Sequence, residues 1–471
     1  MHAIDLSIIA LYLAAVIAAG LWFGRRQKTT SQYFLAGHAV PWWAIAASIV
    51  ATETSTITFI SVPGIAWAAG GDFRFLQIVL GYVIARVIIS FVFMPWYFRG
   101  ELVTVYELLQ TRFGTPVKAL AATLFVLMRC IADGVRLLLT AFVLGAVFQS
   151  FGAGDSAISA SIAGLGIVMI VFTLIGGIEA VVWIEVVQLA IYVLGAIAAA
   201  VVLMNNVGLE AAIELGRAHD KFRLFDFSFD LTKSYNFWAG LIGGTFLTLS
   251  THGTDQYLVQ RYLCTDRPRN AAKALLASAA VVLVQFAGFL FIGVLLFAFY
   301  QPAAPVTAPD QIFPHFITNH MPVGLAGLVV AAILAAAMSS SLNSIAATVV
   351  SDLYAPLVRD RGDRHYLNVS RVVTIAAGVV QIGVGIALQA TTRSALNTAL
   401  SIASLINGPI LGVFLLGATK RGGTASALIG MSSGLAAVMT VAFATNVAWP
   451  WYTVIGALTT LIVGSLAARK P

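Results

Sequence analysis

A short run of polar residues interrupts an apolar segment near the N-terminus, and its residue types suit the binding of a cation or a polar solute. The sequence from Ala51 to Gly64 contains one carboxylate, Glu53, together with six hydroxyl side chains and a Pro-Gly pair. Hydroxyl side chains compete for backbone hydrogen bonds, so this run favours an interrupted helix. Unwound carbonyls of such helices coordinate Na⁺ in transporters. The alternative is a kinked packing helix whose hydroxyls bond back to its own carbonyls.

Two later segments are polar in a similar way. Gly243–Thr245 followed by Ser250–Gln256 predicts a second broken helix. Ser339–Ser344 reads Ser-Ser-Ser-Leu-Asn-Ser and follows three alanines, Ala335–Ala337, that let another helix approach closely. Its hydroxyls suit a cation site, and ordinary helix packing is the alternative.

Three charged residues share one helix face. Arg129, Asp133 and Arg136 fall at i, i+4 and i+7. We expect Asp133 to neutralise Arg129, which leaves the planar guanidinium of Arg136 to bind an anion. The alternative is that Asp133 pairs with Arg136 and that the three residues only join helices.

Other ionisable residues stand in or beside apolar segments. Glu185 is an isolated carboxylate that should be paired or bind a cation. His252 reads more simply as a packing histidine than as a proton relay. Asp72 and Asp255 are expected at segment ends, in solvated or capping positions.

The rest of the chain is too apolar for a soluble protein. Of 471 residues, 59% are hydrophobic and only 10% are charged, whereas soluble domains carry about 25% charged residues. A helix needs about 20 apolar residues to cross a bilayer. Thirteen segments qualify, near 4–24, 41–66, 73–98, 117–149, 156–176, 178–204, 236–258, 272–300, 322–354, 368–388, 394–416, 422–445 and 449–468. The sequence therefore predicts an all-α integral membrane protein.

The basic residues predict how the chain is oriented. Lys and Arg collect in cytoplasmic loops, so the net charge of +7 needs no nucleic-acid partner. With the N-terminus outside, about 18 of the basic residues lie in cytoplasmic loops and about 6 in external ones. Four of these external residues lie in the long polar stretch 205–236, expected to be a loop. The prediction is a multi-pass protein of a bacterial-type inner membrane with a cytoplasmic C-terminus.

Motifs that would indicate an enzyme are missing from the sequence. It contains no Walker lysine motif, HExxH, GxSxG, CxxCH or Cys/His metal spacing. Without a nucleotide-binding domain, uphill transport would have to use an ion gradient.

Several blocks of sequence resemble the solute:sodium symporter family. They are Tyr33–Gly37 with Pro41–Trp43 and Ala51–Gly64, then Tyr106–Gly114, Gly176–Val181 running to Glu185 and Gln188, Asp255–Tyr257 with Val259–Arg261, and Asn343–Ser344 leading to Asp352–Tyr354. The blocks occur in family order across residues 33–354. The resemblance implies a LeuT-like core of two inverted five-helix repeats, each opening with a broken helix.

On this resemblance the chain divides into five parts. A first extra helix takes 1–30, the first repeat 40–204, an external loop 205–235 and the inverted repeat 236–416. Two further helices take 417–471.

The resemblance also implies sites. A main Na⁺ site would use carbonyls of Ala51, Thr54 and Ala336 with the hydroxyls of Ser339 and Ser340, an oxygen set that suits a hard cation. An alternative alignment from Asn343 puts Ala336 and Ala337 at the hydroxyl positions. A second, optional cation site of some members uses an acidic residue that falls on Glu185, and in the alternative alignment Ser339 and Ser340 belong to that site.

Solute contacts of the family fall on Ser55, Thr58, Phe73 and Gln77. Arg136 lies close to a position where members that bind carboxylates place an arginine. To these we add Glu53 and His252 from the polar breaks themselves.

Together these observations predict a symporter that uses Na⁺ as its coupling ion and imports a small polar organic solute, with Arg136 favouring a carboxylate. A sugar, polyol or amino acid is the alternative solute. Proton coupling through Glu53, Glu185 or His252 is the alternative ion. The expected partners are the solute and the lipid bilayer, with no nucleic acid and no obligate protein partner.

Overall fold

The computed structural model describes the chain apart from residues 1, 25–28, 101, 151, 153, 155, 304, 338–340, 359–360, 390–394 and 469–471. Within that part, every regular element is a helix. The first half of the chain forms α1 (Ala3–Gly24), α2 (Thr30–Leu35), η1 (Ala36–His38), α3 (Trp42–Glu53), α4 (Thr56–Trp67), α5 (Leu76–Ile88), η2 (Ile89–Phe93), α6 (Met94–Tyr97), α7 (Glu107–Phe113), α8 (Thr115–Ser150), α9 (Ala157–Val207) and α10 (Leu209–Ala218).

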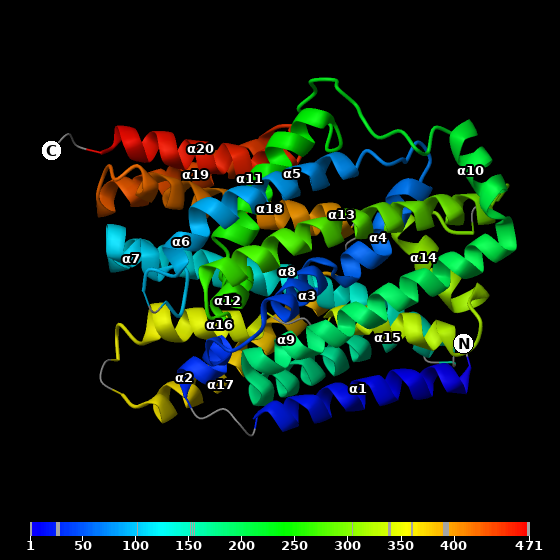
Figure 1. Ribbon diagram of the computed structural model, residues 1–471, viewed down its shortest axis with the longest axis horizontal. Helices are drawn as coiled ribbons and strands as arrows, with labels where there is room; N and C mark the ends of the chain where they lie inside the picture. The colour runs from blue at the N-terminus through cyan, green and yellow to red at the C-terminus, as the bar shows by residue number, and fades with distance from the viewer. Residues whose placement is uncertain are drawn as a thin grey trace.

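The second half forms η3 (Ala239–Gly243), α11 (Gly244–Gly253), α12 (Gln256–Leu263), α13 (Pro268–Phe299), α14 (Pro309–His320), α15 (Leu325–Ala337), α16 (Leu342–Thr348), η4 (Val349–Tyr354), α17 (Asp363–Ala387), α18 (Ala395–Ala418), α19 (Thr424–Ala444) and α20 (Pro450–Leu466). The long helices run side by side along one direction (Figure 1). α1 begins at one end of this bundle and α20 ends at the other.

Seven helical stretches of the described residues are long and apolar enough to cross a bilayer on their own. They are Leu76–Tyr97, Ala157–Leu174, Gly176–Val207, Pro268–Phe299, Asp363–Ala387, Leu400–Ala418 and Thr424–Ala444. Shorter apolar helices, including Ala3–Ala19 and Pro450–Leu466, coincide with other expected spans. The chain is a multi-pass membrane protein, and the count of thirteen spans stays a prediction.

Both expected helix breaks are present. α3 ends at Glu53 and α4 begins at Thr56, with non-helical backbone at Thr54 (ψ 68°) and Ser55 (ψ 170°). α11 ends at Gly253 and α12 begins at Gln256. At this second break the carboxylate of Asp255 accepts from the amide of Tyr257 at 2.9 Å and so caps α12, as expected for a capping aspartate.

A further change of direction falls inside α9. Gly177 has φ 56° and ψ −164°, a conformation open to glycine and costly for other residues. It divides α9 into the two expected spans, 156–176 and 178–204.

One expectation about the loops was wrong. The stretch 205–236, expected to be a loop, contains α10 at Leu209–Ala218. This helix buries Ala212 and Gly216 and packs against α13. Its polar, amphipathic composition hides it from a search for apolar spans, since only one face is covered.

The remainder of that connection is bonded to α4, the second half of the first broken helix. Lys221 is buried, and its ammonium donates to the carbonyls of Ala66 (2.9 Å), Trp67 (3.2 Å) and Ala68 (2.6 Å) at the end of α4. These are carbonyls that a helix leaves without intrahelical partners. Lys221 therefore caps α4.

Both cysteines of the chain are buried free thiols. Cys130 lies on α8, and Cys264 follows the last residue of α12, where its thiol donates to the carbonyl of Gln260.

Candidate functional site

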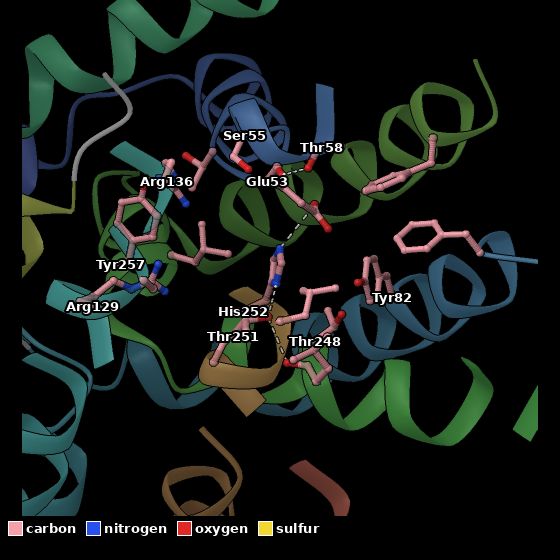
Figure 2. A pocket seen from close by; sticks show the side chains of 18 residues that line it. Glu53, Ser55, Thr58, Tyr82, Arg129, Arg136, Thr248, Thr251, His252 and Tyr257 are labelled. Carbon is pink, nitrogen blue, oxygen red and sulfur yellow. Dashed lines mark hydrogen bonds and ion pairs between the residues drawn. The ribbon is translucent and has the colours of Figure 1, made fainter. Parts of the chain in front are cut away.

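A cavity of about 170 Å³ opens beside the first helix break. Its polar wall comes from the break itself, from α8 and from α11 and α12, and Phe75, Tyr82 and Phe286 make its apolar wall. Figure 2 shows that Arg129, Arg136 and Tyr257 gather on one side and that Glu53 and His252 point toward each other. A mostly apolar pocket with a few converging polar groups is the usual form of a small-molecule site.

The break leaves a backbone carbonyl without its helical donor. In a continuous helix the amide of Ser55 would donate to the carbonyl of Ala51, but here it donates to the carbonyl of Glu53 at 2.9 Å. The hydroxyl of Thr58 reaches the same Glu53 carbonyl at 3.1 Å. The break thereby leaves the Ala51 carbonyl available, and Thr54 lies within the non-helical turn.

α15, the helix that leads to the serine-rich segment, lies next to this break. The hydroxyl of Thr56 donates to the carbonyl of Ile333 on α15 at 2.9 Å. Ala336 lies within α15. Ser339 and Ser340 lie outside the described residues, so their place in a Na⁺ site remains an expectation.

Glu185 is fully engaged by charged and hydroxyl donors. It is 1% exposed and pairs with Arg261 of α12, whose Nη2 lies 2.5 Å from Oε1 and whose Nε lies 3.3 Å from Oε2. Ser48 also donates to Oε2, and Thr52 donates to Oε1 at 3.1 Å. A guanidinium therefore supplies the positive charge that this buried carboxylate requires.

The expected pairing on α8 was wrong. Asp133 pairs with Arg136, with Oδ1 and Nη1 3.6 Å apart, and Ser341 donates to its other oxygen. Arg129 instead pairs with the carboxylate of Asp255. Helical spacing could not reveal this partner, because Asp255 comes from the break between α11 and α12.

Asp255 therefore caps α12 and also neutralises Arg129. It is 2% exposed, so it does not have the solvated position that the sequence also allowed.

Tyr257 connects these arginines. The guanidinium carbons of Arg129 and Arg261 each lie 4.5 Å from its ring centroid, and that of Arg136 lies 6.0 Å away. The hydroxyl of Tyr257 also accepts from Arg136 at 3.4 Å. Cation–π contacts of this kind favour cations held away from water.

Glu53 and His252 form a second polar group with Arg86 of α5. Arg86, whose side chain is 0% exposed, donates to Oε2 of Glu53. Nε2 of His252 lies 3.7 Å from the same oxygen and 3.2 Å from Nη2 of Arg86. The other ring nitrogen contacts the hydroxyl of Thr251 at 3.1 Å.

The structure brings together five of the seven expected solute contacts. Glu53, Ser55, Thr58, Arg136 and His252 all line the cavity.

Phe73 and Gln77 do not line it. The amide of Gln77 donates to the carbonyl of Tyr235 at 3.4 Å and its oxygen accepts from the amide of Asp226, whereas Phe73 makes an edge contact with the ring of Phe222. In this structure both residues hold the connection between the two halves of the chain.

Sequence reasoning missed Tyr257, which lines the cavity. It also missed Arg86 and Arg261, which pair with Glu53 and Glu185. Arg86 carried a usable signal, because a charge within an apolar span is expensive and usually functional or paired. The only sequence signal for Tyr257 and Arg261 was that both belong to a block that resembles the symporter family.

The comparisons with known proteins identify the family of the chain. The profile of the sodium:solute symporter family matches residues 33–434. The chain is 34% identical to the sodium/sialic acid symporter NanT of Aliivibrio fischeri, with 98% of this chain and 93% of the relative aligned. It is 30% identical to the sodium/sialic acid symporter SiaT of Proteus mirabilis, with coverage of 99% and 95%. The human sodium-coupled monocarboxylate transporter 1 is 28% identical, with coverage of 92% and 72%.

Comparison with solved structures shows which known transporters share the fold. A substrate-bound, outward-open Na⁺-coupled sialic acid symporter superposes with a TM-score of 0.89 at 29% identity, covering 99% of this chain and 97% of that one. Mhp1, a nucleobase-cation-symport-1 family transporter, shares the fold at 15% identity and a TM-score of 0.63, with 94% of each chain covered. The all-helical, LeuT-like fold class is therefore confirmed. The chain belongs to the sodium:solute symporter family and is a membrane transporter that couples a small organic solute to Na⁺, not an enzyme.

Proposed function

We propose that this protein imports a small organic carboxylate together with Na⁺ by alternating access, and that the carboxylate lies against Arg136. The observation that carries the proposal is the pair of arginines in the cavity wall. Arg136 lines the cavity beside Arg129, and its planar guanidinium, 3.6 Å from Asp133, has the forked geometry that suits a carboxylate.

The relatives support the same solute class. Two are sodium/sialic acid symporters and one is a sodium-coupled monocarboxylate transporter. Sialic acid and monocarboxylates share a carboxylate, and Arg136 is the cavity cation that contacts Tyr257 through its hydroxyl as well as its ring.

For the ion, we propose the site that the family resemblance implies. It would take the carbonyls of Ala51, Thr54 and Ala336 and the hydroxyls of Ser339 and Ser340. The bond from Thr56 to Ile333 supports it, because this bond holds α15 against the break. Binding of Na⁺ there would favour the state in which the solute site is formed, and this difference in affinity couples the two fluxes.

We also propose the repeat boundaries 40–204 and 236–416, with 1–30 before them, 205–235 between them and 417–471 after them. The N-terminus would face outward and the C-terminus the cytoplasm of a bacterial-type cell. The start of α1 and the end of α20 lie at opposite ends of the bundle, which supports placing the two termini on opposite sides of the membrane (Figure 1).

The test is a thermal-shift screen of the purified protein, followed by uptake into proteoliposomes. Sialic acid, gluconate, hexanoate and sorbitol are compared with and without Na⁺. A ligand selective for the folded state raises the melting temperature, so we expect a Na⁺-dependent rise with at least one acid and none with sorbitol.

Binding of sorbitol with no binding of any acid would overturn the carboxylate proposal in favour of a neutral polyol or sugar. Uptake that follows a pH gradient and ignores Na⁺ would overturn the ion assignment.

A further inference from the structure

We infer that the solute carries a hydrogen-bond donor (a hydroxyl, an amide N–H or an ammonium) in addition to its carboxylate, and that Glu53 accepts from this donor. The inference rests on the proposed function, because it takes the carboxylate to lie at Arg136. It identifies a specificity-determining residue and narrows the solute from any small acid to an acid with a polar body.

The break holds Glu53 at the cavity wall. α3 ends at this residue, and its backbone carbonyl accepts from Ser55 and Thr58, which fixes the turn. Its side chain lines the cavity and is 12% exposed. Glu53 is therefore a cavity-facing carboxylate on a fixed backbone.

The partners of Glu53 leave acceptor capacity. Among the described residues, the ion-pair contacts of Glu53, to Arg86 and to His252, are both made by Oε2. An ionised carboxylate has two acceptor oxygens. A donor arriving through the cavity would find Oε1 as its acceptor.

Arg86 acts as a positioning residue for this carboxylate. Its side chain is 0% exposed, and its Nε and Nη1 have no hydrogen-bond partner in the described part of the chain. The guanidinium thus acts mainly through Nη2, which contacts Glu53 and His252. A buried cation beside Glu53 favours the ionised, accepting form.

The charges around the cavity select the same kind of solute. Arg129 and Arg136 are matched by Asp255 and Asp133, and Glu53 is matched by Arg86. A carboxylate solute with an apolar body would press hydrocarbon against Glu53 and remove water from it without replacing the lost hydrogen bond. A hydroxyl or ammonium at that point supplies the bond.

The experiment measures Na⁺-dependent affinities of four probes for the full-length protein in detergent and in proteoliposomes. Gluconate and hexanoate are six-carbon acids with and without hydroxyls, sorbitol has hydroxyls but no carboxylate, and sialic acid is a larger hydroxylated acid. We expect the better of the two hydroxylated acids to bind at least tenfold more tightly than hexanoate. In Glu53→Gln the ratio of these two affinities should fall at least tenfold, while the affinity for hexanoate stays within twofold of the wild-type value.

Two further variants keep the test independent of folding. Glu53→Gln leaves Arg86 buried without its partner, so Glu53→Gln/Arg86→Met removes both charges and should lose the same preference with a melting temperature near wild type. Glu214→Gln, an exposed glutamate on α10, is the matched control and should change nothing.

The outcomes separate the two proposals. Equal affinities for hexanoate and the hydroxylated acids, or an equal loss of all three acids in Glu53→Gln, would overturn this inference and leave the carboxylate proposal standing. Binding of sorbitol alone, or of no acid, would overturn the carboxylate proposal and this inference with it.

Discussion

Buried charge in this protein is matched across helices. Arg136 and Asp133 both lie on α8, but Arg129 pairs with Asp255 in the break before α12. Glu53 pairs with a residue of α5 and Glu185 with a residue of α12. Removing one partner of such a pair leaves an uncompensated charge in a medium that cannot solvate it, at a cost of about 3–5 kcal/mol. The effect of a single substitution therefore includes the cost of the unpaired charge on the remaining partner.

The first prediction concerns Arg136. Arg136→Lys keeps the charge and its pairing with Asp133 but loses the planar fork. We expect affinity for an acid solute to fall at least tenfold, about 1.4 kcal/mol, while the melting temperature without solute stays near wild type. Calorimetry and thermal unfolding on the same preparation check this. A lower melting temperature with unchanged affinity would show that the residue only joins helices.

The second prediction concerns Glu185. Because Arg261 already neutralises it, Glu185→Gln should destabilise the protein and leave the Hill coefficient for Na⁺ unchanged. The double variant Glu185→Gln/Arg261→Met should recover most of the lost melting temperature, since it removes the stranded cation. A reduced Hill coefficient at an unchanged melting temperature would instead identify Glu185 as a ligand of a second Na⁺.

At the scale of elements, two interrupted helices and the neighbouring helix α15 form the candidate site. α3 and α4 are parted at Thr54 and Ser55, α11 and α12 are parted at Thr254 and Asp255, and α15 lies against the first break. Irregular backbone at membrane depth is tolerated where it lines a cavity or is covered by protein. Here the first break does line a cavity.

The third prediction tests the link between this break and the serine-rich segment. Ser339→Ala/Ser340→Ala should raise the Na⁺ concentration for half-maximal uptake at least tenfold and leave expression intact, because two of five oxygen ligands are lost. Ser61→Ala removes a buried hydroxyl of α4 that has no partner within the described structure, and it serves as control. Unchanged Na⁺ dependence would favour the alternative alignment from Asn343.

The elements were predictable to the extent that their signals are local. Glu53 and six hydroxyls within an apolar run made the first break visible, and the paired glycines with Ser250–Gln256 did so for the second. Partners were not predictable in the same way. Asp255 and Arg129 are separated by 126 residues, and their contact depends on where the fold places the break between α11 and α12 relative to α8. α10 escaped notice because a short amphipathic helix in a polar stretch has no apolar span.

At the scale of the whole molecule, the connection between the proposed repeats holds one part of the first repeat. Lys221 caps α4, and its ammonium lies 4.2 Å from the ring centroid of Phe297 on α13. A movement of α4 away from Lys221 would break three hydrogen bonds at once. The connection therefore takes part in any rearrangement that displaces the end of α4 from Lys221.

The fourth prediction concerns the lowered pKa of Lys221. Burial lowers the pKa of Lys221 from 10.5 to about 8, and release of α4 into water would return it toward the ordinary value. The lower pKa means that Lys221 binds its proton less tightly when it caps α4 than when α4 is released. Raising the pH from 7 to about 9.5 removes this proton and should therefore favour the capped state. Lys221→Arg stays charged throughout.

Hydrogen exchange at the last turn of α4 measures this difference. The exchange rate of the wild type divided by that of the arginine variant cancels the intrinsic effect of hydroxide, and this ratio should fall as the pH rises. A ratio that stays constant, or that rises, would contradict the prediction.

The burial of Cys130 and Cys264 has a practical consequence for following the molecule at work. Thiolate is the form that maleimides attack, and a thiol enclosed by protein presents little of it. A single cysteine introduced at exposed Asp220, next to Lys221, would be the preferred point of labelling without any change to the native thiols. An impermeant reagent added to intact cells would then report which side of the membrane this connection faces, and a fluorophore there would follow α4 as Na⁺ and solute bind.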